Sequence, residues 1–264
     1  MSEKVLPVLY VSHGSPMLAV EPGLAGEQLE KISAYLKTMP IKVIVVVSAH
    51  WLTQYGIGIT GSETPEIIYD FYGFPQELYE LTYPAKGSVE CAGLIRKILA
   101  EKGIAAEIDS DRGLDHGAWV PLRYLFPEAD IPVLQVSIPW PLTPEEAANF
   151  GEALRPLREQ GMLIVTSGSQ THNLRDVAYD EPPHDYIKPF VEWMRKTMDT
   201  HDLEALKNYR TLAPNAVRAH PIEDHFMPML IALAASSEHD KVRLYDGGVA
   251  YSALSMDAYL FESV

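Results

Sequence analysis

The sequence predicts an α/β fold in which a mostly parallel central sheet is flanked by helices. Short apolar runs, rich in Val, Ile and Leu, alternate along the chain with longer segments of helical periodicity. Several of these runs are nearly continuous in apolar residues, which is typical of parallel strands that are covered on both faces. No repeat, low-complexity tract or Pro/Gly-rich linker interrupts the pattern, so we expect residues 1–264 to form a single domain.

Six segments have the composition of buried strands. They are residues 5–11, 42–48, 104–108, 131–137, 162–166 and 242–245. Five segments have apolar positions at helical spacing, and they are residues 24–38, 89–102, 144–160, 186–200 and 225–235. Thr143 before Pro144 is typical of a helix start, because the hydroxyl caps free N–H groups and proline fits the first turn. Gly103 is expected just beyond the helix at 89–102, where a left-handed residue is common.

The segment at residues 60–84 does not fit this alternation. It is long and aromatic, and Gly73, Pro75 and Pro84 interrupt it. Loops of this length in a compact domain are usually functional covers or insertions. We therefore expect this segment to form a wall or lid of a pocket, with Phe71 and its neighbours as candidate lining residues.

The charge balance argues against two classes of partner. The chain carries a formal net charge of -15, and its isoelectric point is about 5.0. Nucleic acids and anionic membrane surfaces repel such a chain, so neither is expected as a main partner. No apolar run approaches the roughly 20 residues that a membrane-spanning helix needs.

The N-terminal segment and the cysteine content indicate a reducing compartment. The first residues lack the basic and apolar stretches of a secretory signal. Cys91 is the only cysteine, so no intramolecular disulfide can form, and its place in an expected helix favours a buried, inert thiol. We therefore expect a cytoplasmic protein. The sequence contains no coiled coil or plain interface stripe that would indicate an oligomeric state.

Histidines recur where the expected strands finish. His13 and His50 each follow an apolar run, and a loop of small residues after 162–166 leads to His172. In an open α/β sheet, ligands bind in the crevice outside the carboxyl ends of the strands. Because imidazole suits Zn, Fe, Cu and Ni, we predict a mononuclear metal site with His13 and His50 as ligands. From spacing alone, each histidine could instead be a hydrogen-bonded residue without a metal, and the loop before His172 could form an anion-binding nest.

A second group of candidate ligands lies between Arg218 and Pro228: His220, Glu223, Asp224 and His225. The prolines predict a turn into a helix, whose N-terminus disfavours an imidazolium and so keeps a histidine neutral and able to bind metal. The two acids could instead cap that helix. His116 stands at an expected loop-to-helix junction. Three further histidines lie in polar stretches and are expected at the surface: His184, His201 and His239.

Six short motifs, taken in order, resemble those of a known family. They are SHGSPM at residues 12–17, VVVSAHW at 45–51, DFYGFP at 70–75, LDHGAWVPL at 114–122, HNLR at 172–175 and EDHFMPML at 223–230. Each motif is weak by itself, but the series extends over most of the chain. Together the motifs are similar to those of the class III extradiol ring-cleavage dioxygenases, and specifically to the 4,5-DOPA extradiol dioxygenase branch.

The resemblance implies a non-haem Fe(II) site that cleaves a catechol ring with O2 beside its hydroxyls, to give a ring-opened semialdehyde acid. Matched position by position, it implies His13, His50 and His225 as metal ligands. It implies His172 as the acid/base near the metal, and His116 as a contact to the substrate that can also donate a proton. Zinc is a possible bound ion in a crystal, although it cannot supply the redox step.

Two questions stay open at this point. Better-known members of the wider class use two histidines and a carboxylate, so Glu223 rivals His225 as the third ligand. The alternative functions are a zinc hydrolase with Glu223 as general base, and a non-catalytic binding protein that keeps the shape of the metal site. The sequence does not identify a group that would meet the carboxylate of an amino-acid substrate.

Overall fold

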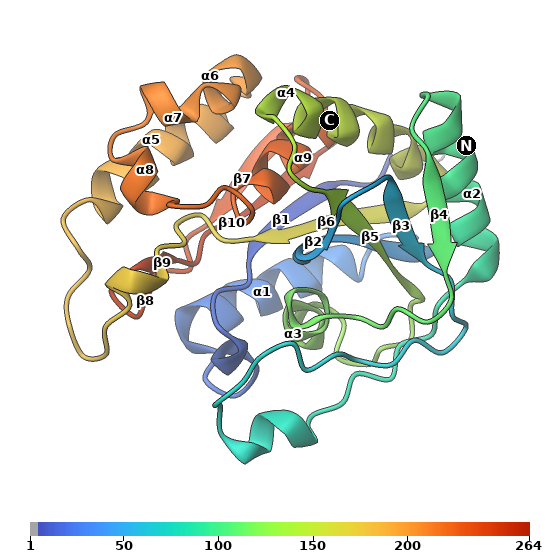
Figure 1. The fold of residues 1–264 in the computed structure, drawn as a ribbon, viewed down its shortest axis with the longest axis horizontal. Helices are drawn as coiled ribbons and strands as arrows, with labels where there is room; N and C mark the ends of the chain where they lie inside the picture. The colour runs from blue at the N-terminus through green and yellow to red at the C-terminus, as the bar shows by residue number, and fades with distance from the viewer. Residues whose placement is uncertain (1–4) are drawn as a thin grey trace.

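The computed structural model describes residues 5–264, and its centre is an eight-stranded sheet with helices on both faces (Figure 1). The first four residues of the N-terminal segment lie outside the described part of the chain. The strands of this sheet are β1 (Val8–Ser12), β2 (Val43–Thr53), β3 (Ile57–Thr60), β4 (Ala106–Asp109), β5 (Val133–Pro139), β6 (Met162–Gly168), β7 (Lys241–Tyr245) and β10 (Ala258–Glu262). A separate pair is formed by β8 (Val249–Ala250) and β9 (Leu254–Ser255).

The helices lie between these strands in the chain. They are α1 (Gly23–Leu36), α2 (Val89–Glu101), α3 (His116–Leu125), α4 (Pro144–Leu154), α5 (Ile187–Asp199), α6 (Leu203–Lys207), α7 (Tyr209–Leu212), α8 (Ala216–Ala219) and α9 (Met227–Ala235). Short 3₁₀ turns are η1 (Pro16–Ala19), η2 (Gln76–Glu80), η3 (Arg155–Gln160) and η4 (Leu174–Asp176). In Figure 1, α4 and α9 cover one face of the sheet and α1 and α3 cover the other.

The sheet is mostly parallel, as predicted. Its order is β4-β3-β5-β2-β6-β1-β10-β7. The four central strands, β5, β2, β6 and β1, are parallel to one another, whereas β10 pairs antiparallel with both β1 and β7. The predicted fold class is therefore confirmed. Since parallel neighbours end at the same edge, the carboxyl ends of β1, β6 and β2 lie side by side.

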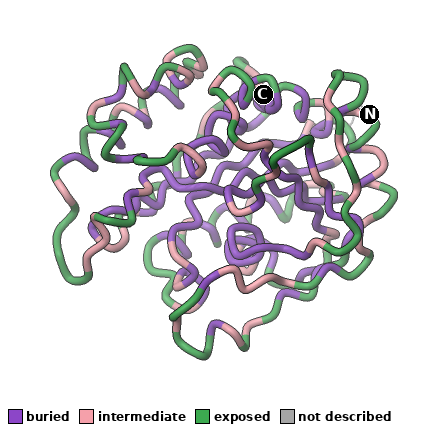
Figure 2. The backbone as a smooth tube through the Cα atoms, in the orientation of Figure 1, coloured by how far each residue is buried: buried purple, intermediate pink, exposed green. Residues whose placement is uncertain are grey.

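Both faces of the central strands are buried, which explains their continuous apolar runs. In β2, Val43, Val45 and Val47 belong to the hydrophobic core on one face, where α4, α5 and α9 pack. Ile44 and Val46, between them, belong to the core on the other face, with α1 and α3. Successive strand residues point to opposite faces, so a run covered on both sides has to be apolar throughout. Figure 2 shows these strands as a buried centre inside an exposed rim.

The predicted start of α4 and the predicted end of α2 are confirmed, but α4 is shorter than expected. Thr143 and Glu146 form a reciprocal capping box at the start of α4. Gly103 follows the end of α2 with a φ of +76°, the left-handed conformation that glycine adopts freely. The helix expected to reach residue 160 ends at Leu154 and continues as the 3₁₀ turn η3. Pro156 explains this, because proline lacks the N–H that an α-helix interior needs.

Strand β2 is longer than predicted, and its irregular part lies at the histidine. We expected the strand to finish before His50, but it continues through Trp51 to Thr53. The pairing of β2 with β5 shifts register between Val47 and Leu52. Bulges of this kind re-aim side chains and are common next to functional sites. Strands β3 and β10 and the short pair β8 and β9 were not predicted; β3 is a short Gly-containing run, and β10 lies between β1 and β7 in the sheet.

The aromatic segment at residues 60–84 is a wall rather than a free lid. The Tyr69 hydroxyl donates to the Leu81 carbonyl at 2.7 Å, and the Trp119 indole donates to the Ile68 carbonyl at 3.2 Å. Phe71 is buried in the core beside α3. Backbone and side-chain bonds thus hold the segment against the body of the protein.

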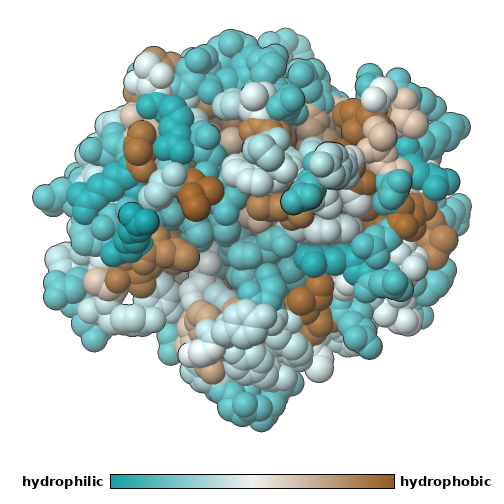
Figure 3. Space-filling model, in the orientation of Figure 1, coloured by the Kyte–Doolittle hydropathy of each residue, from teal (hydrophilic) through white to brown (hydrophobic). Residues whose placement is uncertain are grey.

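The surface agrees with the acidic composition. Figure 3 shows hydrophilic residues over most of the visible face, with apolar residues in small separate patches. No helix within residues 5–264 is long and apolar enough to cross a membrane. Cys91 in α2 packs against the core but is only partly buried, so the expectation of a buried thiol was wrong.

A buried ion pair joins η3 to the chain before β7, and we predict that it is important for stability. Arg158 Nη2 lies 2.7 Å from Asp240 Oδ2, and both side chains are almost fully buried. Asp240→Ala leaves the guanidinium buried without a counter-charge, so the free energy of unfolding should fall by about 3–5 kcal/mol. Urea denaturation measures this. Glu128→Ala breaks the exposed Lys37 pair and should leave the midpoint nearly unchanged; equal shifts in the two variants would contradict the prediction.

Candidate metal centre

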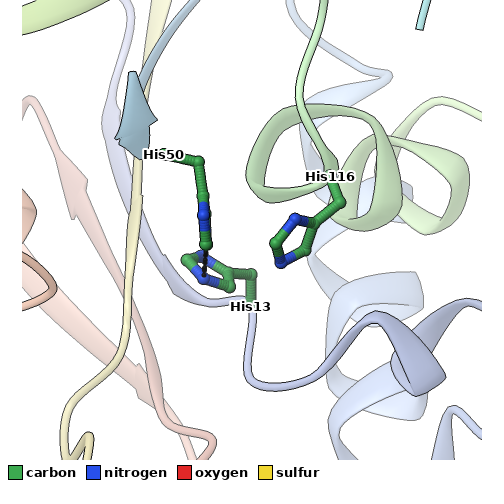
Figure 4. Close-up of side chains that lie close together, drawn as sticks. All are labelled: His13, His50 and His116. Carbon is green, nitrogen blue, oxygen red and sulfur yellow. Dashed lines mark hydrogen bonds between the residues drawn. The ribbon is translucent and has the colours of Figure 1, made fainter. Parts of the chain in front are cut away.

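Five histidines gather at the carboxyl edge of the central strands. They come from three loops, one strand and the start of one helix, and are His13, His50, His116, His172 and His225. Their rings lie in contact across the cluster, with centroids between 3.5 and 5.5 Å apart in the pairs that touch. Figure 4 shows the rings of His13 and His50 meeting tip to tip, with His116 beside them. The sequence prediction named all five.

The strand register brings the first histidines together. In the sheet, Ser12 of β1 pairs with Gly168 of β6, and Ser48 of β2 pairs with Ser167 of β6. The backbone N–H of His13 continues this ladder by donating to the Gly168 carbonyl at 2.9 Å. The end of β6 therefore lies between the two segments that carry His13 and His50.

Two imidazole nitrogens lie close to Nε2 of His50. Nε2 of His50 lies 3.0 Å from Nε2 of His13 and 3.2 Å from Nε2 of His225. Two nitrogens bound to one ion at about 2.0–2.1 Å, at angles of about 90–109°, lie about 2.9–3.4 Å apart. The spacing is thus that of ligands sharing one ion. His116 also brings a nitrogen within 4.8 Å of those of His13 and His50.

A hydroxyl fixes which nitrogen of His13 carries the proton. The Ser167 hydroxyl contacts Nδ1 of His13 at 2.9 Å and also donates to the Gly117 carbonyl. A hydroxyl has one proton, and a carbonyl can only accept, so Ser167 must accept from an N–H at Nδ1. The lone pair of neutral His13 is therefore on Nε2, which faces the centre of the cluster.

Asp70, on the aromatic segment, contacts the Nδ1 atoms of two other histidines, as Ser167 contacts that of His13. Its Oδ2 lies 3.4 Å from Nδ1 of His50, and its Oδ1 lies 3.0 Å from Nδ1 of His116. Oδ1 also accepts the backbone N–H of His116 at 2.9 Å. Burial alone would raise the pKa of Asp70, but its contacts with His116 and His50 lower it to about 2. The ionised carboxylate directs the Nε2 atoms of both rings toward the cluster.

The two rival third ligands, His225 and Glu223, have different neighbours. Nδ1 of His225 lies 3.1 Å from Asp224 Oδ1, which leaves Nε2 for the cluster. The carboxylate of Glu223 is directed elsewhere, because it accepts hydrogen bonds from Tyr209 at 2.9 Å and Arg210 at 3.0 Å. The expectation that the two acids cap α9 was wrong, since α9 has no side-chain cap.

Burial keeps the cluster uncharged. The pKa of His13 and the pKa of His225 are far below the ordinary value, first because of burial and then because of neighbouring imidazoles. Burial also lowers the pKa of His50 and of His172 to about 4, although nearby carboxylates oppose the shift. At pH 7 these four rings are therefore neutral, which is the form that binds metal ions.

His172 differs from the other members of the cluster. Its ring stacks on that of His225 with centroids 3.5 Å apart and planes inclined by 8°. Within the described residues, its ring nitrogens have no hydrogen-bond partner. The loop before it does not form an anion-binding nest, because its Ser169 N–H donates to the His225 carbonyl. The neutral ring is thus held in place by stacking and has both nitrogens available.

A cavity of about 240 Å³ opens directly onto the cluster. His50, His116, His172 and His225 form its floor, and apolar side chains such as Phe71 form its walls. An apolar cavity of about 150 Å³ is enough to bind benzene in another protein. The space therefore suits a single aromatic ring beside the histidines.

Comparison with known proteins identifies the family. Residues 7–262 match the family model described as the catalytic LigB subunit of aromatic ring-opening dioxygenase. The chain belongs to the LigB family of ring-opening dioxygenases. It is 37% identical to the 4,5-DOPA dioxygenase extradiol of Beta vulgaris over 99% of this chain and 98% of that protein. It is 35% identical to the protein of the same name from Escherichia coli K12, over 97% and 95% of the two chains.

A solved structure of the same fold agrees with this family. It is the crystal structure of an uncharacterized protein from Escherichia coli K12, which superimposes with a TM-score of 0.80 at 29% identity. The match covers 97% of this chain and 99% of that one. The predicted class, an extradiol ring-opening dioxygenase acting on a small aromatic molecule with O2, is thereby confirmed. Glu223, the general base of the hydrolase alternative, is hydrogen-bonded to Tyr209 and Arg210.

The remaining histidines lie outside the cluster. His220 is fully buried, and its Nε2 contacts the Gln170 carbonyl at 2.9 Å. His239 is exposed as expected, whereas His184 and His201 are half-buried and hydrogen-bonded. None of these four joins the site.

We predict that Ser167 controls the tautomer of His13. In the metal-free protein, ¹⁵N NMR should show the proton of His13 on Nδ1. Ser167→Ala removes the acceptor, so the Nε2–H tautomer should appear and zinc affinity should fall about 10- to 100-fold. Ser169→Ala is the matched control, because that hydroxyl donates to Thr171 in the same loop and touches no histidine. An unchanged His13 spectrum in Ser167→Ala would refute the assignment.

Proposed function

We propose that this chain is an Fe(II)-dependent dioxygenase that cleaves the ring of DOPA or a similar catechol with O2 to a ring-opened semialdehyde acid. The observation that carries the proposal is the convergence of three imidazole lone pairs beside a cavity for one aromatic ring. His13, His50 and His225 would hold the metal. His172 and His116 would handle protons.

The residues present fit a divalent transition metal. The Nε2 atom of His50 lies 3.0 Å from that of His13 and 3.2 Å from that of His225, a spacing that suits ligands of one shared cation. All three donors are neutral imidazoles, which suit iron and also zinc, and an oxygen acceptor stands behind each ring. Bound iron would supply the redox chemistry with O2, which zinc cannot supply. Zinc in a crystal would therefore mark the site without being the working metal.

His172 is the group proposed to take a proton from a catechol hydroxyl. Its pKa is lowered, first by burial, so the ring is neutral at pH 7 and can accept a proton. The ring lines the cavity and has no competing hydrogen-bond partner among residues 5–264.

His116 is the group proposed to return a proton during ring opening. Its Nδ1 lies 3.0 Å from the Asp70 carboxylate, which holds the ring in place beside the cavity. His116 and His172 both line the cavity. We assign the two proton-transfer roles to these two rings, with His172 as the base and His116 as the acid.

We propose that residues 1–264 act as one catalytic domain in the cytoplasm. The lone cysteine supports this, because it suits a reducing compartment.

Metal exchange tests the proposed function. Protein reconstituted with Fe(II) without air, and then given O2 and DOPA or another catechol, should consume O2 and form a yellow product. The zinc-loaded protein should bind the catechol and leave O2 unconsumed, because zinc has no redox step. Oxygen uptake and visible absorbance measure both results. If the iron form leaves a broad panel of catechols intact while the zinc form cleaves an ester or amide, the proposal fails.

The ligand assignment predicts a contrast between two neighbouring residues. His225→Ala should lose most of its metal, because one of three donors is removed. Glu223→Ala should keep it, since that carboxylate bonds Tyr209 and Arg210 instead. Metal content by mass spectrometry of the purified proteins measures this, with circular dichroism to check folding. Retention in His225→Ala and loss in Glu223→Ala would reverse the assignment.

Metal content together with turnover distinguishes the proposed acid/base, His172, from the proposed ligands. His172→Ala should retain metal and slow turnover about 10²- to 10⁴-fold, as expected for loss of a general acid/base. Loss of the metal itself would make His172 a ligand.

A further inference from the structure

A second cavity adjoins the one that suits the aromatic ring. It has a volume of about 660 Å³, and it shares His50, His172, Leu174 and His225 with the ring cavity. A molecule whose ring lies against the histidines can therefore extend a side chain into the second cavity. The chemistry of that cavity indicates which side chain it accepts.

Arg175 is the one arginine or lysine on the wall of this second cavity within the described residues. Its guanidinium has no hydrogen bond or ion pair with any residue in the range 5–264. The adjacent acid, Asp176, does not pair with it, because Asp176 accepts from Arg218 at 3.0 Å and from Asn173 at 2.9 Å. The cation is thus available to a ligand although a carboxylate lies next to it in the sequence.

The other formal charge on this wall does not neutralise Arg175. Asp224 accepts the backbone N–H of His225 at 2.7 Å and lies 3.1 Å from the Nδ1 atom of the same residue. The protein as a whole carries a charge of -15, which repels small anions. The unpaired guanidinium of Arg175 is therefore a local positive charge on a negatively charged protein. It is the group in this cavity that would attract an anion.

We propose that Arg175 forms a subsite for a carboxylate at the end of a short side chain of the substrate. This rests on the proposed function, in which the catechol ring occupies the cavity at the histidines. Guanidinium matches carboxylate geometry with two parallel N–H···O bonds, so the subsite favours catechols that carry a carboxylate over neutral ones. It answers the question that the sequence left open, namely which group meets the carboxylate of an amino-acid-like substrate.

The test compares two catechols that differ in charge. Dihydrocaffeate carries a carboxylate on a two-carbon chain, and 4-propylcatechol has a neutral chain of the same length. The Fe(II)-loaded wild type should prefer dihydrocaffeate. In Arg175→Gln, the ratio of kcat/KM for dihydrocaffeate to that for 4-propylcatechol should fall about 10- to 100-fold, through KM, because a charge-assisted pair is lost. Arg175→Lys should keep part of the preference, and Arg96→Gln, which removes an exposed arginine on α2, should keep all of it.

A binding measurement tests the Arg175 subsite independently of the proposed ring-cleavage reaction. Calorimetry without O2 measures the affinity of the metal-loaded proteins for the same two catechols, whether or not either is cleaved. If neither catechol is cleaved but Arg175→Gln still loses the preference in binding, the proposed reaction fails and the subsite stands. If Arg175→Gln keeps the wild-type preference, or lowers the affinity for both catechols by the same factor, the subsite is refuted.

Discussion

The register of β1, β6 and β2 is the constraint on which the site depends. Ser12 pairs with Gly168 and Ser48 pairs with Ser167, so the segments that carry His13 and His50 lie on either side of the end of β6. A slip of one residue would turn each side chain to the opposite face and separate the histidines. The register is itself fixed by burial on both faces, because every residue of β1 and β6 is buried. The core and the cluster are therefore determined together.

The position of a histidine in the chain does not by itself orient its imidazole ring. In this structure, contacts at the Nδ1 atoms orient the rings. The Nδ1 atom of His13 contacts β6 through Ser167, whereas that of His50 faces Asp70 on the aromatic segment. That of His225 faces Asp224 in its own turn. Each oxygen lies behind the ring and leaves Nε2 for the centre of the cluster. The arrangement of lone pairs is thus a property of the assembled fold rather than of any one segment.

The sequence predicted what local patterns determine. Runs of Val and Ile indicated the central strands, and His13 and His50 stood out because they follow such runs. The bulge that re-aims His50 was missed, since it depends on pairing with β5. Asp70 was quoted only as part of a motif, and no local signal shows that it lies behind two histidines distant in sequence. Arg175 was likewise unassigned, because its lack of a partner is visible only once Asp176 is seen bonded to Arg218.

The aromatic segment links the shape of the cavity to the orientation of the histidines. Asp70 contacts His50 and His116, and the next residue, Phe71, lines the cavity and packs in the core. Because the two side chains share one stretch of backbone, a change that moves Phe71 to enlarge the cavity also moves the carboxylate behind the rings. Substrate size is therefore difficult to alter at this wall without disturbing the cluster. Leu174 and Arg175 line the neighbouring cavity two and three residues after His172, so a change that moves their backbone would also reach a histidine of the cluster.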